Sequence, residues 1–126
     1  MSNHLFDAIS SAAPNDAAFI RTRDGSVWTY GDAFDLAGRI AGAIDTLGIR
    51  PGDRVAAQVD KSPEALTLYL ACLRSGAVYL PLNTAYTLAE LDYFIGDAKP
   101  RLIVVSSAAR AGVAKIAEPH DAIVET

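Results

Sequence analysis

From residue 54 onward, short apolar runs alternate with segments that carry apolar residues at helical spacing. The runs cover residues 55–59, 77–82, 102–105 and, more weakly, 122–124, and they begin about 20 to 25 residues apart. The segments between them, residues 63–75, 88–97 and 108–118, have the length and spacing of amphipathic helices. Strand–helix–strand units at this interval predict right-handed crossovers and a parallel βαβ-type sheet flanked by helices, which is an α/β fold.

The first 50 residues show a different pattern, in which helical segments surround a short hairpin. Asn3 is a suitable N-cap for a first helix, and Pro14 marks the end of that helix. Residues 18–22 and 26–29 flank residues 23–25 (RDG), whose Asp-Gly pair suits a tight turn. The sequence therefore predicts a short amino-terminal hairpin of two antiparallel strands.

Local signals mark where most of the helices begin and end. A Ser or Thr followed by an acidic residue three positions later predicts a capping box, and Ser before Pro predicts a simple N-cap. These boundary signals are Thr29 with Asp32, Gly48 at the end of the same helix, Ser62 before Pro63, Thr87 with Glu90, and Ser106 or Ser107 for the last helix.

The stretch from Leu73 to Asn83 joins a helix to a buried strand through Gly76. Gly76 suits the left-handed position just past a helix end. Residues 77–82 are apolar on both faces, which predicts an interior strand at the centre of the sheet. Pro81 lacks an N–H and must end the pairing nearby, so the loop after it is expected at the carboxyl edge, where α/β proteins tend to bind ligands.

Length, charge and cysteine content exclude several classes of protein. A chain of 126 residues predicts one domain, and a net charge of −4 argues against nucleic acid as a partner, because that partner requires a basic face. The single cysteine, Cys72, lies among apolar helical residues and is predicted to be a buried thiol in a cytoplasmic protein. No run has the apolar length of a signal peptide or a membrane span, so no membrane association is expected.

The usual catalytic and phosphate-binding motifs are missing from the sequence. It contains no Gly-x-x-x-x-Gly-Lys loop, no Gly-x-Gly-x-x-Gly turn, and no His or Cys spacing typical of zinc. His4 and His120 lie at opposite ends of the chain without a partner pattern. Catalytic residues and metal ligands are therefore predicted to be absent from this chain.

Tyr79 and Tyr86 bracket the Pro81 loop and are the nearest candidates for side chains that face a ligand. A structural role in the core is the favoured interpretation, since tyrosines with one bonded hydroxyl are common there. No Lys or Arg occurs between Arg74 and Lys99. An anionic ligand would consequently have to bind backbone amides, such as those at the start of the helix that Thr87 caps.

Three segments, in order and in register, resemble the amino-terminal conserved segments of the adenylate-forming acyl-CoA synthetases. They are residues 28–33 (WTYGDA), 48–56 (GIRPGDRVA) and 73–83 (LRSGAVYLPLN). The run from Glu64 through Ala98, with LNTAYTLAELDYF inside it, looks most like malonyl-CoA synthetases.

The resemblance implies a two-step ligase that uses ATP, Mg²⁺ and CoA. Malonate or a related short dicarboxylic acid would form an acyl-adenylate, and CoA would then displace AMP to give the thioester. The phosphate loop, the ribose-binding Asp, the hinge and the mobile domain with its lysine would all lie beyond residue 126, so none is assigned here.

Residues 1–126 are accordingly interpreted as the amino-terminal α/β subdomain, an incomplete portion of a larger acyl-CoA synthetase. The chain alone is predicted to bind no cofactor and to be inactive. Its candidate role is one rim of the acyl or CoA channel, formed by Asn83, Thr84, Ala85 and Tyr86, while Gly76 and Pro81 are structural. The remaining subdomains are the expected partners, and the surfaces exposed without them predict self-association.

Two other readings remain open from the residues themselves. One is a free-standing, non-catalytic binding or interaction module with the same fold. The other, a small nucleotide-binding protein, is disfavoured because the sequence lacks a phosphate loop.

Overall fold

The structure is a computed structural model that describes residues 4–12 and 14–126 in two compact units. Unit 1 contains the described residues up to Arg50 together with Lys61–Gly76, and unit 2 contains Pro51–Asp60 and Ala77–Thr126. Each unit is described by itself. No helix in the described ranges has the length and apolarity to cross a membrane.

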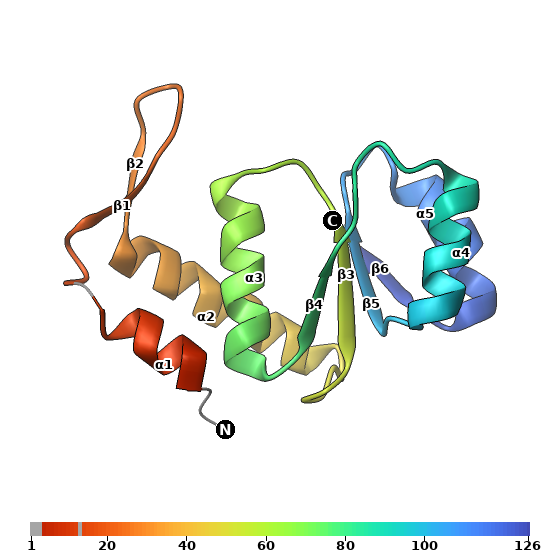
Figure 1. Cartoon of the computed structure of the whole chain (residues 1–126), viewed down its shortest axis with the longest axis horizontal. Helices are drawn as coiled ribbons and strands as arrows, with labels where there is room; N and C mark the ends of the chain where they lie inside the picture. Colours follow the sequence, from red (N-terminus) through yellow and green to blue (C-terminus); the bar gives the residue numbers. More distant parts are fainter. Residues whose placement is uncertain (1–3, 13) are drawn as a thin grey trace. The chain divides into compact units, whose positions relative to one another are not determined.

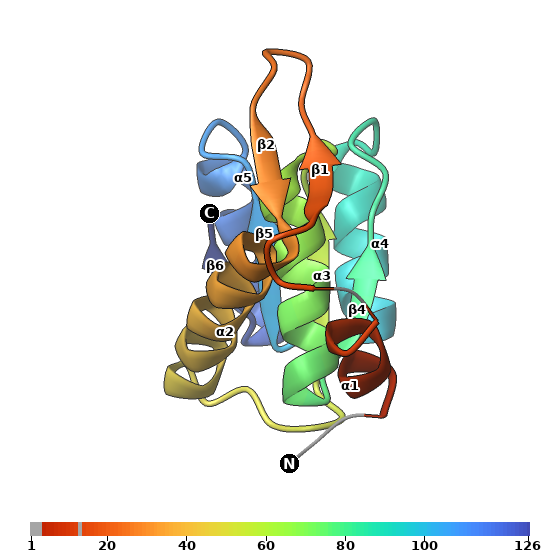
Figure 2. The ribbon, with the colours of Figure 1, turned by 90° about the vertical axis from the view of Figure 1, so that its left-hand side faces the viewer.

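Unit 1 consists of three helices and the predicted hairpin. The second strand of the hairpin leads directly into the helix Tyr30–Thr46 (Figure 2). Strands β1 and β2 are antiparallel, as expected. The predicted cap at Asn3 lies outside the described residues. The elements of unit 1 are α1 (His4–Ser10), β1 (Ala18–Arg21), β2 (Val27–Thr29), α2 (Tyr30–Thr46) and α3 (Pro63–Ser75).

The hairpin turn is closed by backbone and side-chain bonds around Asp24. The Gly25 N–H donates to the Thr22 carbonyl at 3.1 Å, and Gly25 has a φ of +90° that suits glycine. The Asp24 carboxylate accepts from the Thr22 hydroxyl and from the Ser26 N–H. Those bonds, the Thr22 bond above all, lower the pKa of Asp24 from 3.8 to about 2.

An aromatic cluster and an arginine connect the elements of unit 1. Phe6 meets Phe34 edge to face with ring centroids 5.8 Å apart, Tyr30 lies next to Phe34, and Phe19 stacks on Tyr30 at 4.4 Å. The Arg74 guanidinium of α3 lies over the Phe6 ring at 5.8 Å. These contacts tie α1, the hairpin, α2 and α3 together.

Unit 2 contains a four-stranded sheet in which every neighbouring pair is parallel, in the order β4-β3-β5-β6. Together with the helices and the hairpin, this confirms the predicted α/β class. The elements are β3 (Arg54–Gln58), β4 (Val78–Pro81), α4 (Leu88–Ala98), β5 (Leu102–Val105), α5 (Arg110–Ala117), the 3₁₀ turn η1 (Glu118–His120) and β6 (Ile123–Glu125).

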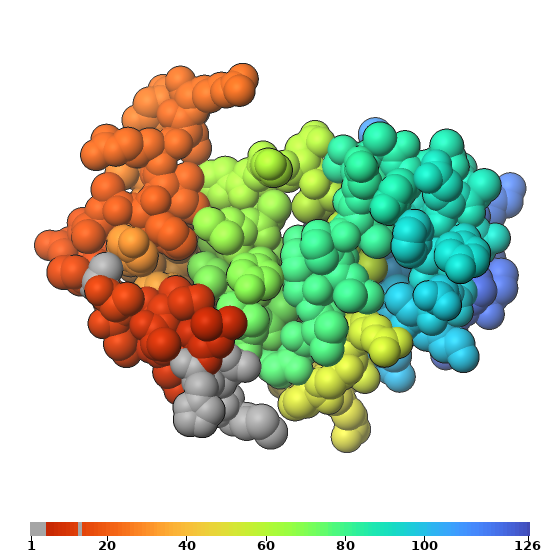
Figure 3. All heavy atoms as spheres, viewed as in Figure 1, coloured from red at the N-terminus to blue at the C-terminus, as the bar shows by residue number. Residues whose placement is uncertain are grey.

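Helices α4 and α5 lie side by side on one face of this sheet (Figure 1). Their apolar stripes and the facing strand positions form one core. The other side of α4 lies at the surface, where its atoms appear teal in the space-filling view (Figure 3). The core residues are Ala56, Leu91, Ile95, Ile103, Val105, Val113 and Ala117.

The prediction that residues 77–82 form the central strand is wrong, because β4 lies at an edge of the described sheet. The central strands are β3 and β5, where four of five and three of four residues are buried. In β4 both end residues are exposed, including Val78 at 43%. Pro81 is the last residue of β4, as expected, and its missing N–H is itself typical of an edge strand.

One expectation about the last helix is corrected. Neither Ser106 nor Ser107 caps α5; their carbonyls accept from Ala109 and Arg110 in a turn, and the N-cap position is Ala109 without a side-chain bond. His120, for which the sequence shows no partner pattern, lies with its Nε2 3.3 Å from the Asp92 carboxylate. That contact joins residues 28 positions apart, beyond the range of any local pattern.

Gly76 has the left-handed conformation that the sequence predicts, with a φ of +75° just past α3. We expect Gly76→Val to lower the free energy of unfolding by about 1–2 kcal/mol, because a branched side chain is strained at this φ. Gly42→Ala is the control: Gly42 lies inside α2 with open space where the alanine methyl group would project, so the change should stabilise by about 0.5–1 kcal/mol. Equal stability of the Gly76→Val and parent proteins in urea unfolding would contradict the expectation.

Cys72 lies in α3 with none of its surface exposed. Burial raises the pKa of its thiol to about 12, so the reactive thiolate is scarce at ordinary pH. We expect thiol reagents at pH 8 to label the native protein far more slowly than glutathione in the same solution, and labelling to become rapid in urea. Rapid labelling without urea would show that the core around α3 opens.

Candidate functional site

The candidate rim residues lie together in one turn after β4, at the carboxyl edge of the sheet in unit 2. Asn83, Thr84 and Ala85 are exposed, and Tyr86 is half-buried. The turn follows immediately after the Leu82 N–H donates to the Ala57 carbonyl at 2.8 Å, which is where the β3–β4 ladder ends. The structure therefore places all four residues in the loop that follows β4, and their role as a rim stays a prediction.

The turn is held by its own hydrogen bonds. The Asn83 side-chain oxygen accepts from the Ala85 N–H at 2.9 Å, and the Asn83 carbonyl accepts from the Tyr86 N–H at 3.1 Å. These bonds contribute to the backbone shape of the turn, in which the side chains of Asn83, Thr84 and Ala85 are exposed.

A residue that sequence reasoning did not single out adds two more bonds. Gln58, the last residue of β3, is only 8% exposed, and its Nε2 lies 3.0 Å from the Asn83 carbonyl and 3.4 Å from the Tyr86 carbonyl. Its signal in the sequence is a single amide within the otherwise apolar run at residues 55–59. A buried amide of this kind normally requires hydrogen-bond partners.

The Tyr86 side chain packs against α4. Its ring stacks on Phe94 with centroids 5.0 Å apart and an interplanar angle of 18°, and Tyr93 meets Phe94 edge to face at 5.8 Å. Tyr79 is half-buried in β4. The favoured structural interpretation of Tyr86 is thus supported by its ring contact.

The start of α4 is less suited to an anion than the sequence suggests. The predicted capping box is present: the Glu90 N–H donates to the Thr87 hydroxyl at 3.2 Å, and the Glu90 carboxylate accepts from the Thr87 N–H at 3.1 Å. The chain's own carboxylate therefore lies where an anionic ligand would meet the positive end of the helix.

No group of three or more His, Cys, Asp or Glu residues in the described ranges is arranged to hold a metal ion. The Asp92–His120 pair joins the surface of α4 to η1 and lies apart from the Asn83–Tyr86 turn in sequence. No residue of the chain is assigned a role in holding Mg²⁺ or the phosphates of ATP.

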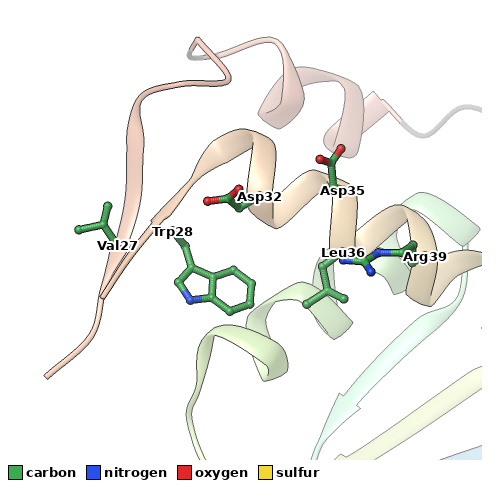
Figure 4. Close-up of a pocket in the computed structure, with 6 residues that line it drawn as sticks. All are labelled: Val27, Trp28, Asp32, Asp35, Leu36 and Arg39. Carbon is green, nitrogen blue, oxygen red and sulfur yellow. The ribbon is translucent and has the colours of Figure 1, made fainter. Parts of the chain in front are cut away.

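Unit 1 carries an open pocket of about 300 Å³ on α2 and β2. Figure 4 shows the Trp28 ring and the Leu36 side chain on the same side of α2, with the Asp35 carboxylate directed away from them. Asp32 in its wall already accepts from the Thr29 N–H at 2.9 Å. None of the rim residues predicted from the sequence lies in this pocket, which is lined by Val27, Trp28, Asp32, Asp35, Leu36 and Arg39.

Comparison with known proteins gives matches along nearly the whole chain. The crystal structure of apo MatB from Rhodopseudomonas palustris is 47% identical, with a TM-score of 0.91, over 98% of this chain and 25% of that chain. The ATP-bound form of the same protein matches with a TM-score of 0.90.

Curated relatives are more distant. Acyl-CoA ligase sidI of Aspergillus fumigatus is 34% identical over 82 residues, which are 65% of this chain and 14% of that protein. Malpinin synthetase of Mortierella alpina is 34% identical over 113 residues, or 90% of this chain and 1% of that protein. The chain thus spans a quarter of the MatB structure and much less of these relatives.

The match to a family model decides the assignment. Residues 6–126 match the model of the AMP-binding enzymes, and the same segment has the parallel sheet and the short hairpin seen in the fold above. This chain belongs to the AMP-binding enzyme family, as its resemblance to the amino-terminal portion of the adenylate-forming acyl-CoA synthetases predicts.

Proposed function

We propose that this chain forms the amino-terminal α/β portion of an ATP-dependent acid–thiol ligase. The main support is the 47% identity to MatB over 98% of the chain, a protein whose structure also exists in an ATP-bound form. The acyl-CoA ligase of A. fumigatus and a feruloyl-CoA synthase of Amycolatopsis, both 34% identical, support a carboxylic acid and CoA as the substrates.

The proposed reaction has two steps. A carboxylate oxygen of the acid attacks the α-phosphorus of ATP, which forms the acyl-adenylate and releases pyrophosphate. The CoA thiol then loses its proton and attacks the acyl carbon, so a C–S bond forms as the bond to AMP breaks. Mg²⁺ bound with ATP would supply charge neutralisation during the first step.

Malonate, or a closely related short dicarboxylic acid, is the proposed acid. The support is the run from Glu64 through Ala98, which resembles malonyl-CoA synthetases, and this run includes α4 and the Asn83–Tyr86 turn. The role proposed for this chain is to provide the sheet and one rim of the acyl or CoA channel. The reacting groups would come from the rest of the ligase, which would be the physiological partner of these residues.

The chain alone is proposed to be inactive. We expect the chain, given malonate, ATP and Mg²⁺, to exchange no labelled pyrophosphate into ATP above background. A chimera in which it replaces the matching quarter of MatB should form AMP when acid and CoA are present, because the missing groups are then supplied. MatB itself is the positive control.

The results of these two experiments distinguish the ligase hypothesis from the binding-module hypothesis. Exchange by the chain alone would contradict its inactivity. A folded chimera without activity for any acid would contradict the ligase role and favour a free-standing binding module.

Self-association through the β4 edge is proposed for the isolated chain. Val78 is 43% exposed on this edge strand, and an exposed apolar side chain on an edge strand favours association with another copy, whereas a lysine there opposes it. Light scattering should show an average mass above that of the monomer as the concentration rises, and Val78→Lys should reduce it. Leu66→Lys, at a 37% exposed position of α3, is the control and should not. A monomer at all concentrations would contradict the proposal.

A further inference from the structure

The hydrogen-bond ladder between β3 and β4 ends just before the Asn83–Tyr86 turn begins. Ala57 is paired with Pro81, which has no N–H, and the last ladder bond runs from the Leu82 N–H to the Ala57 carbonyl at 2.8 Å. Beyond that point the turn needs another source of order if its exposed backbone is to keep one conformation.

Gln58 follows Ala57 in β3, and its side chain hydrogen-bonds the backbone of the turn. Carbonyl oxygens only accept hydrogen bonds, so the two contacts at 3.0 and 3.4 Å require the NH₂ group of the amide to face Asn83 and Tyr86. One amide thereby joins the first and the last residue of the turn, which are also linked directly by the bond from the Tyr86 N–H to the Asn83 carbonyl.

The chemistry around the turn favours a neutral ligand group. No charged side chain occurs from Ser75 through Ala89, and the Glu90 carboxylate lies at the start of α4 beside Thr87. A phosphate or carboxylate would be repelled by Glu90, whereas peptide N–H and C=O groups and the Thr84 hydroxyl can bond an uncharged polar group.

We propose that Gln58 is a positioning residue that holds the Asn83–Tyr86 turn in the shape that receives a neutral, hydrogen-bonding amide part of CoA. The proposal rests on the ligase function proposed above. Gln58 acts through the backbone of the turn and touches no reacting atom.

The first test measures the turn directly in the 126-residue chain. Gln58→Leu keeps a similar volume but removes both donors, so amide hydrogen exchange at Ala85 and Tyr86 should become about ten- to a hundredfold faster. Thr67→Val is the matched control. It removes a buried hydroxyl that donates to the Glu64 carbonyl at 2.7 Å within α3, and it should leave exchange in the turn unchanged.

Gln58→Met provides a second variant of similar length if Gln58→Leu does not fold. Unchanged exchange at Ala85 and Tyr86 in a folded variant would overturn the proposal. Faster exchange throughout unit 2 would also overturn it, because that result would show general destabilisation.

The second test measures substrate binding in the MatB chimera. Gln58→Leu should raise the KM of CoA about tenfold, with kcat within about twofold and the KM values of ATP and of the acid unchanged. A rise in the KM of the acid with that of CoA unchanged would overturn the proposal. A fall in kcat with every KM unchanged, or no change at all, would overturn the positioning role.

The two tests also separate this proposal from the proposed function. A folded chimera without activity even before substitution would count against the ligase and would remove the substrate role of Gln58. Amide exchange would then decide alone whether Gln58 holds the turn.

Discussion

Parallel pairing of β3 with a strand on each side is the constraint on which the rest of unit 2 depends. The register joins Val55 to Tyr79 on one side and to Leu102 on the other. Parallel neighbours cannot be linked by a tight hairpin, so the chain must return across the sheet between strands. The same constraint places the carboxyl ends of β3, β4 and β5 at one edge, which brings Gln58 beside the turn after β4.

That edge carries a turn whose shape is held by hydrogen bonds and a ring contact. The turn satisfies its backbone through Asn83 and Gln58, and Tyr86 is anchored by its stack on Phe94. A rim ordered before a ligand arrives loses less conformational entropy on binding. The turn lies within residues 6–126, the segment that matches the model of the AMP-binding enzymes.

Helix caps show how far local signals can be trusted. Thr29 with Asp32, Ser62, and Thr87 with Glu90 all make the bonds that their spacing predicts, because donor and acceptor are three residues apart on the same helix start. Ser106 and Ser107 have the right residue type but are separated from α5 by a turn, and their carbonyls rather than their hydroxyls hold it. A cap depends on the backbone angle at one position, which residue type alone does not decide.

The sequence by itself determined the class of fold, the identity and approximate bounds of every strand and of most helices, the left-handed Gly76, the end of β4 at Pro81 and the family resemblance. These features depend on periodicity, on φ preferences and on contacts within a few residues. Only the tertiary structure decided that β4 is an edge strand, that Gln58 reaches carbonyls 25 and 28 residues ahead, and that His120 meets Asp92. Strand order and long-range side-chain contacts arise from how the elements pack, and an apolar run has the same appearance at the centre of a sheet as at an edge covered on its faces.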